Sequence, residues 1–151
     1  MDGEDFIQTL LPPVEQYLTV VETFLAGLEK PSLKLFMTSL LDQEKEHLKD
    51  IAANFLSREF PEKNDPEYLD TCKKLLETMI RNLPQMTDSL SLIKDTIERK
   101  KAAYELFSYL ASSIAISSVS DSFTSIAMEE KRHIKLLEDR LTLEELSSGL
   151  V

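Results

Sequence analysis

The chain has few glycines, a single cysteine and fewer basic than acidic residues. It has three glycines in 151 residues, which favours long helices because glycine weakens a helix interior. Its one cysteine, Cys72, excludes an intrachain disulfide and a Cys-x-x-Cys electron-transfer site. Basic residues are outnumbered 17 to 27, giving a net charge of −10, which argues against nucleic acid or an anionic membrane as a partner. No apolar run approaches about 18 residues, so we expect no membrane span.

What remains is the composition of one helical domain. Hydrophobic residues make up 42% and charged residues 29%, as in ordinary globular proteins, and the length allows a sizeable core. We predict an all-α fold and a single domain over residues 1–151. The first residues, MDGED, are acidic, unlike a signal peptide, so we expect a cytoplasmic protein.

Apolar spacing predicts five helices. They run over about 5–29, 31–56, 66–80, 87–116 and 121–146. Pro12-Pro13 either kinks the first helix or marks its true start, and residues 57–65 and Pro84 interrupt the chain. Asp65 and Pro66 look like the cap and first turn of the third helix. We expect the serine-rich stretch Ser117, Ser118 and Ser120 to separate the last two helices.

The segments form two similar halves. Residues 40–47 (LLDQEKEH) parallel residues 126–133 (IAMEEKRH). We predict a four-helix bundle of two helical hairpins, over about 5–56 and 87–146, joined by a crossover helix within 57–84.

The chain has two histidines, and each follows a glutamate by three residues: Glu44 and His47, Glu130 and His133. An i, i+3 pair lies on one helix face. Each pair also continues an apolar stripe, which in the second helix includes Met37 and Leu40 and in the last includes Phe123 and Ile126. Glu and His are costly to bury without partners. Two inward Glu-x-x-His pairs are part of the ligand set of a di-iron or di-manganese bundle.

At these residues the chain resembles the rubrerythrin-related branch of the ferritin-like superfamily, over most of residues 10–140. The resemblance implies a ferritin-like four-helix bundle in which Glu15, 32 residues before His47, is a further metal ligand. It implies that Glu44 and Glu130 bridge two irons while His47 and His133 bind one each. The implied chemistry is ferrous oxidation or peroxide reduction.

The chain departs from this family in three respects. The repeat matches Glu15 to Lys100, 33 residues before His133, and Lys100 continues the apolar stripe of its own helix. The family's tyrosine positions hold Glu22 and Phe107, and a rubredoxin-type cysteine quartet is absent from the sequence. Lysine is a poor ligand when protonated, so the second metal site is weakened.

Several residues therefore have two interpretations. Glu15 is a ligand or a surface acid, and Glu22 is a replacement ligand or a partner of Lys100. Lys100 is an internal cation paired with Glu22 or Glu130 rather than a catalytic base. Glu98 is a solvent-exposed acid, or a ligand if a local shift turns it inward. Tyr104 is expected in the core.

Two further assignments concern surface and filler positions. The acidic residues Glu129, Glu144 and Glu145 are expected to face solvent, and Cys72 to fill space on the crossover helix.

We thus predict a ferritin-like metal-binding protein, with iron as the expected metal and manganese or zinc as alternatives. Its expected partners are metal ions, an external electron donor and a second copy in a homodimer. The alternative function is a metal-free or single-metal structural homologue with a salt-bridged core. A helical interaction module without any site would need both Glu-x-x-His pairs to face solvent.

Overall fold

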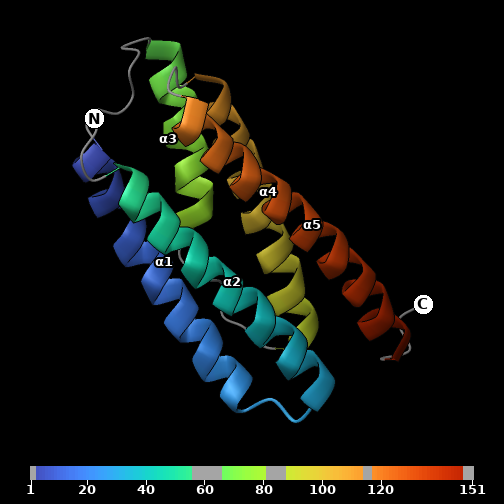
Figure 1. Ribbon diagram of the computed structural model, residues 1–151. Coiled ribbons are helices and arrows are strands. Elements are labelled where there is room, and N and C mark those ends of the chain that lie inside the picture. The colour runs from blue at the N-terminus through green and yellow to red at the C-terminus, as the bar shows by residue number, and fades with distance from the viewer. Residues whose placement is uncertain (1–2, 56–65, 81–87, 114–116, 148–151) are drawn as a thin grey trace. The chain divides into compact units, whose positions relative to one another are not determined.

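A computed structural model describes residues 3–55, 66–80, 88–113 and 117–147, which are almost entirely helical (Figure 1). The helices are α1 (Gly3–Ala26), α2 (Pro31–Phe55), α3 (Pro66–Ile80), α4 (Ser89–Ser113) and α5 (Ser117–Ser147). No strand occurs among these residues, so the all-α prediction is confirmed. Residues 57–65 and Pro84 lie outside the described parts of the chain.

Helix ends follow the local sequence where the chain supplies a cap. Asp88 precedes α4, and its Oδ1 accepts a hydrogen bond of 2.7 Å from the backbone N–H of Ser91. This N-cap contact satisfies a donor that has no partner within the helix. The hydrogen bonds from Ser91 hold the pKa of Asp88 below its usual value of 3.8. At the other hairpin, Pro31 opens α2, where its missing N–H costs nothing.

The structure rules out one of the two interpretations of Pro12-Pro13 and contradicts one expected helix boundary. α1 begins at Gly3, so Pro12-Pro13 lies within the helix and does not mark its start. α5 begins at Ser117, so the serine-rich stretch is the first turn of this helix and not a break before it. Serine hydroxyls can bond to backbone carbonyls of the preceding turn without ending a helix. Ser122 Oγ donates in this way to the carbonyl of Ser118, at 3.1 Å.

The chain divides into two compact units, Met1–Leu69 and Asp70–Val151. In the first unit α1 packs along α2 as a hairpin (Figure 1). Apolar side chains are buried at helical spacing on both helices: Leu18, Val21 and Leu25 on α1, and Leu33, Met37, Leu40 and Leu41 on α2. The first hairpin is therefore as predicted, whereas the assignment of the whole chain to one domain stays a prediction.

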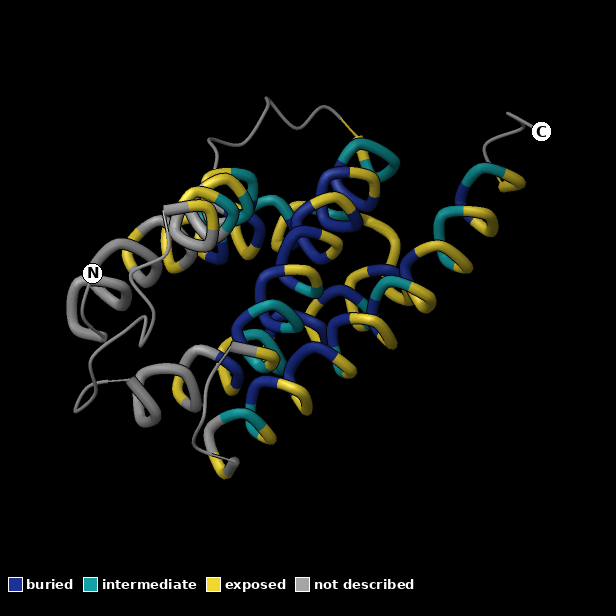
Figure 2. The backbone as a smooth tube through the Cα atoms, turned by 90° about the horizontal axis from the view of Figure 1, so that it is seen from above, coloured by how far each residue is buried: buried dark blue, intermediate teal, exposed yellow. Residues whose placement is uncertain are grey.

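In the second unit α4 packs along α5 as the second predicted hairpin. The rings of Phe107 and Phe123 stack between them, with centroids 5.9 Å apart and an interplanar angle of 6°. Leu92, Ile93, Leu106, Leu110 and Leu137 are also fully buried. Full burial of a side chain of this size contributes about 1.5–3 kcal/mol. Figure 2 shows buried positions recurring turn by turn along the helices, as amphipathic packing requires.

A buried arginine connects α3 to α4 inside this unit. Arg99 Nε donates to Asp95 Oδ2 at 2.7 Å, and Arg99 Nη1 donates to the backbone carbonyl of Met79 at 2.8 Å. Met79 lies in the last turn of α3, where carbonyls lack partners within the helix. Arg99 thus satisfies a carbonyl at the end of α3 while its own charge is balanced by Asp95.

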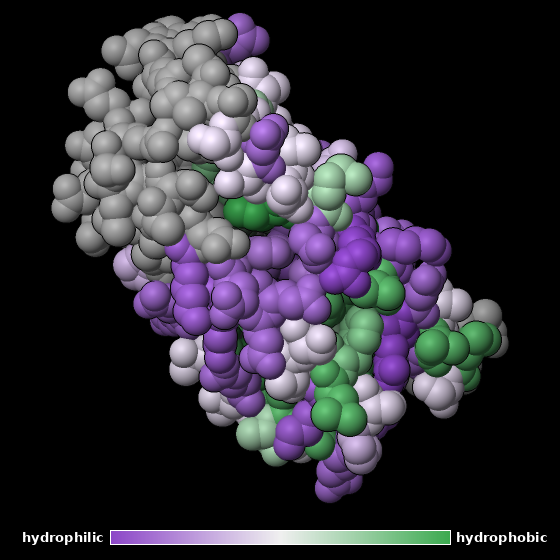
Figure 3. All heavy atoms as spheres, in the orientation of Figure 1, coloured by the Kyte–Doolittle hydropathy of each residue, from purple (hydrophilic) through white to green (hydrophobic). Residues whose placement is uncertain are grey.

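One face of the described residues is largely polar. Figure 3 shows a mainly hydrophilic face with scattered hydrophobic patches, including one at the end of α5 where Leu143 and Leu146 are exposed. Over the described residues, no helix combines the length and the apolar character that crossing a membrane requires.

Candidate metal centre

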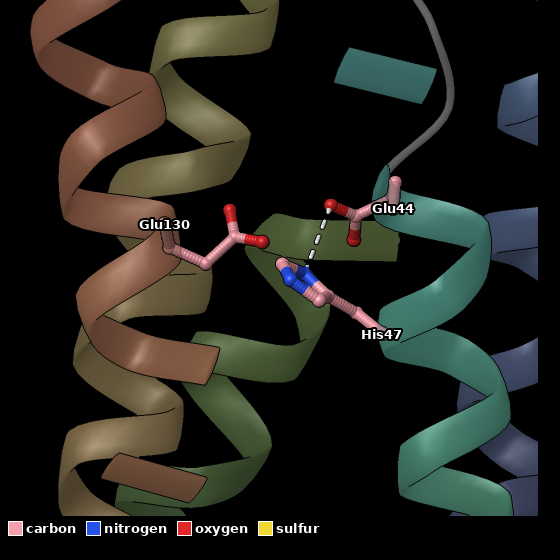
Figure 4. A group of neighbouring side chains, drawn as sticks. All are labelled: Glu44, His47 and Glu130. Atoms are coloured by element: carbon pink, nitrogen blue, oxygen red, sulfur yellow. Dashed lines mark ion pairs between the residues drawn. The ribbon is translucent and has the colours of Figure 1, made fainter. Parts of the chain in front are cut away.

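Glu44 and His47 continue the apolar stripe of α2, as predicted. His47 is buried, and the side chain of Glu44 is 16% exposed. Leu33, Met37 and Leu40 precede them on the same stripe and are buried. Figure 4 shows both side chains projecting from one face of α2, with the ion pair between them dashed.

The spacing of this pair fits a shared metal ion. His47 Nδ1 lies 3.8 Å from Glu44 Oε2, too far apart for a strong hydrogen bond. Two such atoms bound to one ion, each at about 2.0–2.2 Å, lie at most about 4.3 Å apart. An imidazole nitrogen and a carboxylate oxygen also form a donor set that suits iron, manganese and zinc. Glu44 and His47 can therefore bind one ion without moving apart.

Glu130 and His133 occupy the matching stripe of α5. Both are fully buried, and so are Phe123, Ile126 and Leu137 on the same stripe. Figure 4 shows the side chain of Glu130 projecting from α5. Glutamate and histidine side chains such as those of Glu44, His47 and Glu130 can bind metal ions. The prediction that these pairs lie within apolar stripes is confirmed, and the interaction module without a site is thereby disfavoured.

Lys100 reaches Glu130 from α4. Its Nζ donates to Glu130 Oε2 at 3.0 Å, and the two side chains are 8% and 0% exposed. Of the two partners predicted for Lys100, the structure thus gives it Glu130. The ammonium holds one of the oxygens that a metal ion would use.

His133 has a different carboxylate beside it. Its Nε2 lies 3.6 Å from Oε2 of Glu129, which is 45% exposed. Arg132 pairs with that same carboxylate at 2.9 Å, and Arg132 Nη2 lies 3.5 Å from His133 Nε2. Glu129 was expected to be a solvated acid, but this partly buried side chain is a neighbour of the second histidine.

The remaining predicted ligands lie on the surface. Glu15, Glu22 and Glu98 are all exposed. The alternative in which Glu98 turns inward is wrong for this structure, because Asp95, Thr96, Ile97, Arg99 and Lys100 fill the buried positions around it. The exposure of Glu15 favours its interpretation as a surface acid.

Glu22 has a partner of its own on α2. Its carboxylate forms an ion pair with Lys45, and both side chains are 47% exposed. The hydrogen bond from Lys45 to Glu22 raises the pKa of Lys45 above its usual value of 10.5. This surface pair does not favour Glu22 as a replacement ligand.

Three other expectations differ from the structure or lie outside it. Glu144 was expected to face solvent but is 5% exposed, because Arg140 pairs with it at 3.1 Å. Tyr104 was expected in the core but is half-buried, and Lys131 Nζ lies 6.0 Å from its ring centroid. The side chain of Cys72 lies outside the described part of α3.

The buried pair Asp95 and Arg99 was missed by the sequence analysis. Its one signal is the i, i+4 spacing of an acid before a base, which also occurs in exposed pairs such as Asp70 and Lys74. Spacing alone could not distinguish the buried pair from the exposed one.

A family model described as Rubrerythrin matches residues 19–141. Curated proteins and solved structures give no match. The matched range includes both Glu-x-x-His pairs, Lys100 and Glu22, and it excludes Glu15.

Proposed function

The chain belongs to the rubrerythrin family of the ferritin-like superfamily, and on this premise we propose that it is a metal-binding protein whose centre is built on Glu44 and His47. The observation that carries the proposal is the geometry of this pair. Its ligand atoms are 3.8 Å apart, on a buried stripe of α2 where a solvated pair has no reason to lie.

The family pattern also supplies Glu130, His133 and Glu15 as donors. Because Glu130 is paired with Lys100 and Glu15 is exposed, the proposed centre depends on Glu44 and His47. Iron is the proposed metal, with manganese and zinc as alternatives. Bound iron would supply reaction with dioxygen or peroxide, that is, ferrous oxidation or peroxide reduction.

The residues of the chain have definable roles in this function. Glu44 supplies negative charge that attracts a cation, and the imidazole of His47 supplies a neutral donor. The buried apolar residues Met37 and Leu40 precede the pair on the same stripe of α2, and a hydrophobic shell around a metal site controls the access of solvent to it. Electrons would come from an external donor, because one cysteine cannot form an electron-transfer site.

The experiment is elemental analysis of metal per chain, after purification without chelators and after anaerobic addition of ferrous iron. We expect bound iron in the wild type and its loss in the Glu44→Gln/His47→Gln variant. The matched control is Glu46→Gln, which makes the same change at an exposed position of the same helix. If the wild type binds no metal under either condition, the proposal is wrong.

Activity is tested separately on the iron-loaded protein. We expect ferrous oxidation or peroxide consumption above that of free iron. An iron-loaded chain inactive in both assays would keep the metal-binding function and refute the oxidoreductase.

A second candidate function is supported by the ion pair of Lys100 and Glu130. In this alternative the chain is a structural homologue with a salt-bridged core and no metal. Its stability would be unchanged by chelators or by ferrous iron.

A further inference from the structure

The second unit contains an internal cation at a predicted metal ligand. Lys100 is 6% exposed and Glu130 is 0% exposed, and Lys100 Nζ lies 3.0 Å from Glu130 Oε2. Neither charge could be buried alone at an acceptable cost. The ammonium therefore does for Glu130 what a bound metal ion would do, which is to balance its charge.

Other buried carboxylates in this unit are balanced in the same way. Asp95 pairs with Arg99 at 2.7 Å, and Glu144 pairs with Arg140 at 3.1 Å. The other acidic residues of α4, Glu98 and Glu105, are exposed. Within the described part of the second unit, no second carboxylate is thus buried beside Glu130 to complete a metal site.

We propose that Lys100 excludes metal from Glu130 and His133, so that the second hairpin holds an ammonium in place of an ion. A divalent cation bound to Glu130 Oε2 at about 2.2 Å would lie within about 5 Å of Lys100 Nζ, whose distance to that oxygen is 3.0 Å. The two like charges would repel each other strongly in this buried setting. A chain that binds metal through Glu44 and His47 then binds one ion and not two.

A basic group also lies beside His133. The guanidinium of Arg132 lies 3.5 Å from His133 Nε2 and pairs at 2.9 Å with Glu129, whose carboxylate is 3.6 Å from that nitrogen, so Arg132 already balances this acid. A second basic group therefore lies next to the other predicted ligand. The binding of one ion through Glu44 and His47 rests on the proposed function, whereas the exclusion of metal from Glu130 and His133 does not.

The test is metal content in variants that remove the ammonium. Lys100→Glu adds a carboxylate opposite Glu130, and Lys100→Met removes the charge while keeping a side chain of similar length. The control is Lys101→Glu, the same charge change one residue on, at an exposed position. Each is made in the wild type and in the Glu44→Gln/His47→Gln background, loaded with ferrous iron anaerobically or with zinc, and measured by elemental analysis.

We expect Lys100→Glu to gain one ion per chain in both backgrounds, with no gain in Lys101→Glu. The melting temperature of Lys100→Glu should be below that of the wild type without metal and should rise on metal addition. If Lys100→Glu does not fold, the metal content of Lys100→Met tests the inference instead, because this variant does not place two carboxylates beside each other in the core.

The outcomes separate this inference from the proposed function. Two ions in the wild type would overturn the inference while supporting a di-iron centre. If the wild type binds no metal but the Lys100→Glu variant does, the proposed function is refuted and the inference is supported. No added ion in either folded Lys100 variant would overturn the inference.

Discussion

Lys100 and Glu130 are held in place by each other's charge. A buried ion pair adds little net stability, since the cost of desolvating both charges offsets much of their attraction. Removing one partner is costly, because the other charge stays buried without the group that balanced it. The pair therefore contributes little to the stability of the second unit, but a substitution of only one of its two residues should destabilise that unit.

Without metal, we predict that Lys100→Ala lowers the free energy of unfolding by about 3–5 kcal/mol, because the buried Glu130 carboxylate loses the ammonium that balances its charge. The double variant Lys100→Met/Glu130→Leu should lose much less, since neither charge remains. Denaturant titration followed by circular dichroism measures both values.

Lys101→Ala is the control for helix content and net charge, because Lys101 is exposed on the next position of α4. We expect a change within about 0.5 kcal/mol there. Equal losses at Lys100 and Lys101 would mean that the buried pair has no special role.

At the scale of the helix, α4 is fixed at its start by a cap. The Asp88 carboxylate accepts the Ser91 N–H, and its pKa is lowered by that contact. A group with a lowered folded-state pKa stabilises the fold above its unfolded pKa, here 3.8, and the stabilisation is lost as the pH falls through the folded value.

We therefore predict that Asp88→Ala lowers the melting temperature at pH 7 and that its difference from the wild type shrinks as the pH falls below 3.8. Thermal melts at a series of pH values test this. Glu105→Ala, at an exposed position in the interior of α4, should show no such dependence, and a constant difference for Asp88→Ala would argue against the cap.

Arg99 of α4 donates a hydrogen bond to the end of α3. We predict that Arg99→Met lowers the free energy of unfolding by about 3–5 kcal/mol, because the buried Asp95 carboxylate loses the guanidinium that balances its charge. It also removes the donor to the Met79 carbonyl, so amide hydrogen exchange should quicken most in the last turn of α3.

Arg99→Lys keeps the charge but loses the planar fork that serves two acceptors, and it should recover only part of the stability. Arg132→Met removes an arginine from an exposed i, i+3 pair and should change stability little. Similar losses at Arg99 and Arg132 would contradict the anchoring role.

The helices could be predicted from spacing because their apolar stripes repeat, but their ends could not. Ser117 was assigned to a break because serine is a weak helix former, whereas hydroxyls such as that of Ser122 bond back to the preceding turn. Pro12-Pro13 was left as a kink or a start, and α1 continues through it from Gly3. Such ends depend on local hydrogen bonds that composition does not encode.

For the whole molecule, the sequence predicted the all-α fold, the family and the position of both Glu-x-x-His pairs on buried helical stripes, because each pair continues an apolar spacing. It also predicted Glu130 as a partner of Lys100. It missed the burial of Asp95, Arg99 and Glu144, since an i, i+4 ion pair has the same spacing on a buried face as on an exposed one. The exposure of Glu15 was one of two alternatives that spacing left open.

The single-ion chain and the metal-free chain differ in how stability depends on metal. An ion that binds the folded state alone stabilises it by about 2.7 kcal/mol at 100 times its dissociation constant. We predict that zinc or anaerobic ferrous iron raises the melting temperature, that a chelator reverses the rise, and that Glu44→Gln/His47→Gln abolishes it. A metal-independent melting temperature in the wild type would leave the ion pair of Lys100 and Glu130 as the organising feature of a metal-free ferritin-like protein. A rise that survives the double variant would instead mean that the stabilising ion binds away from Glu44 and His47.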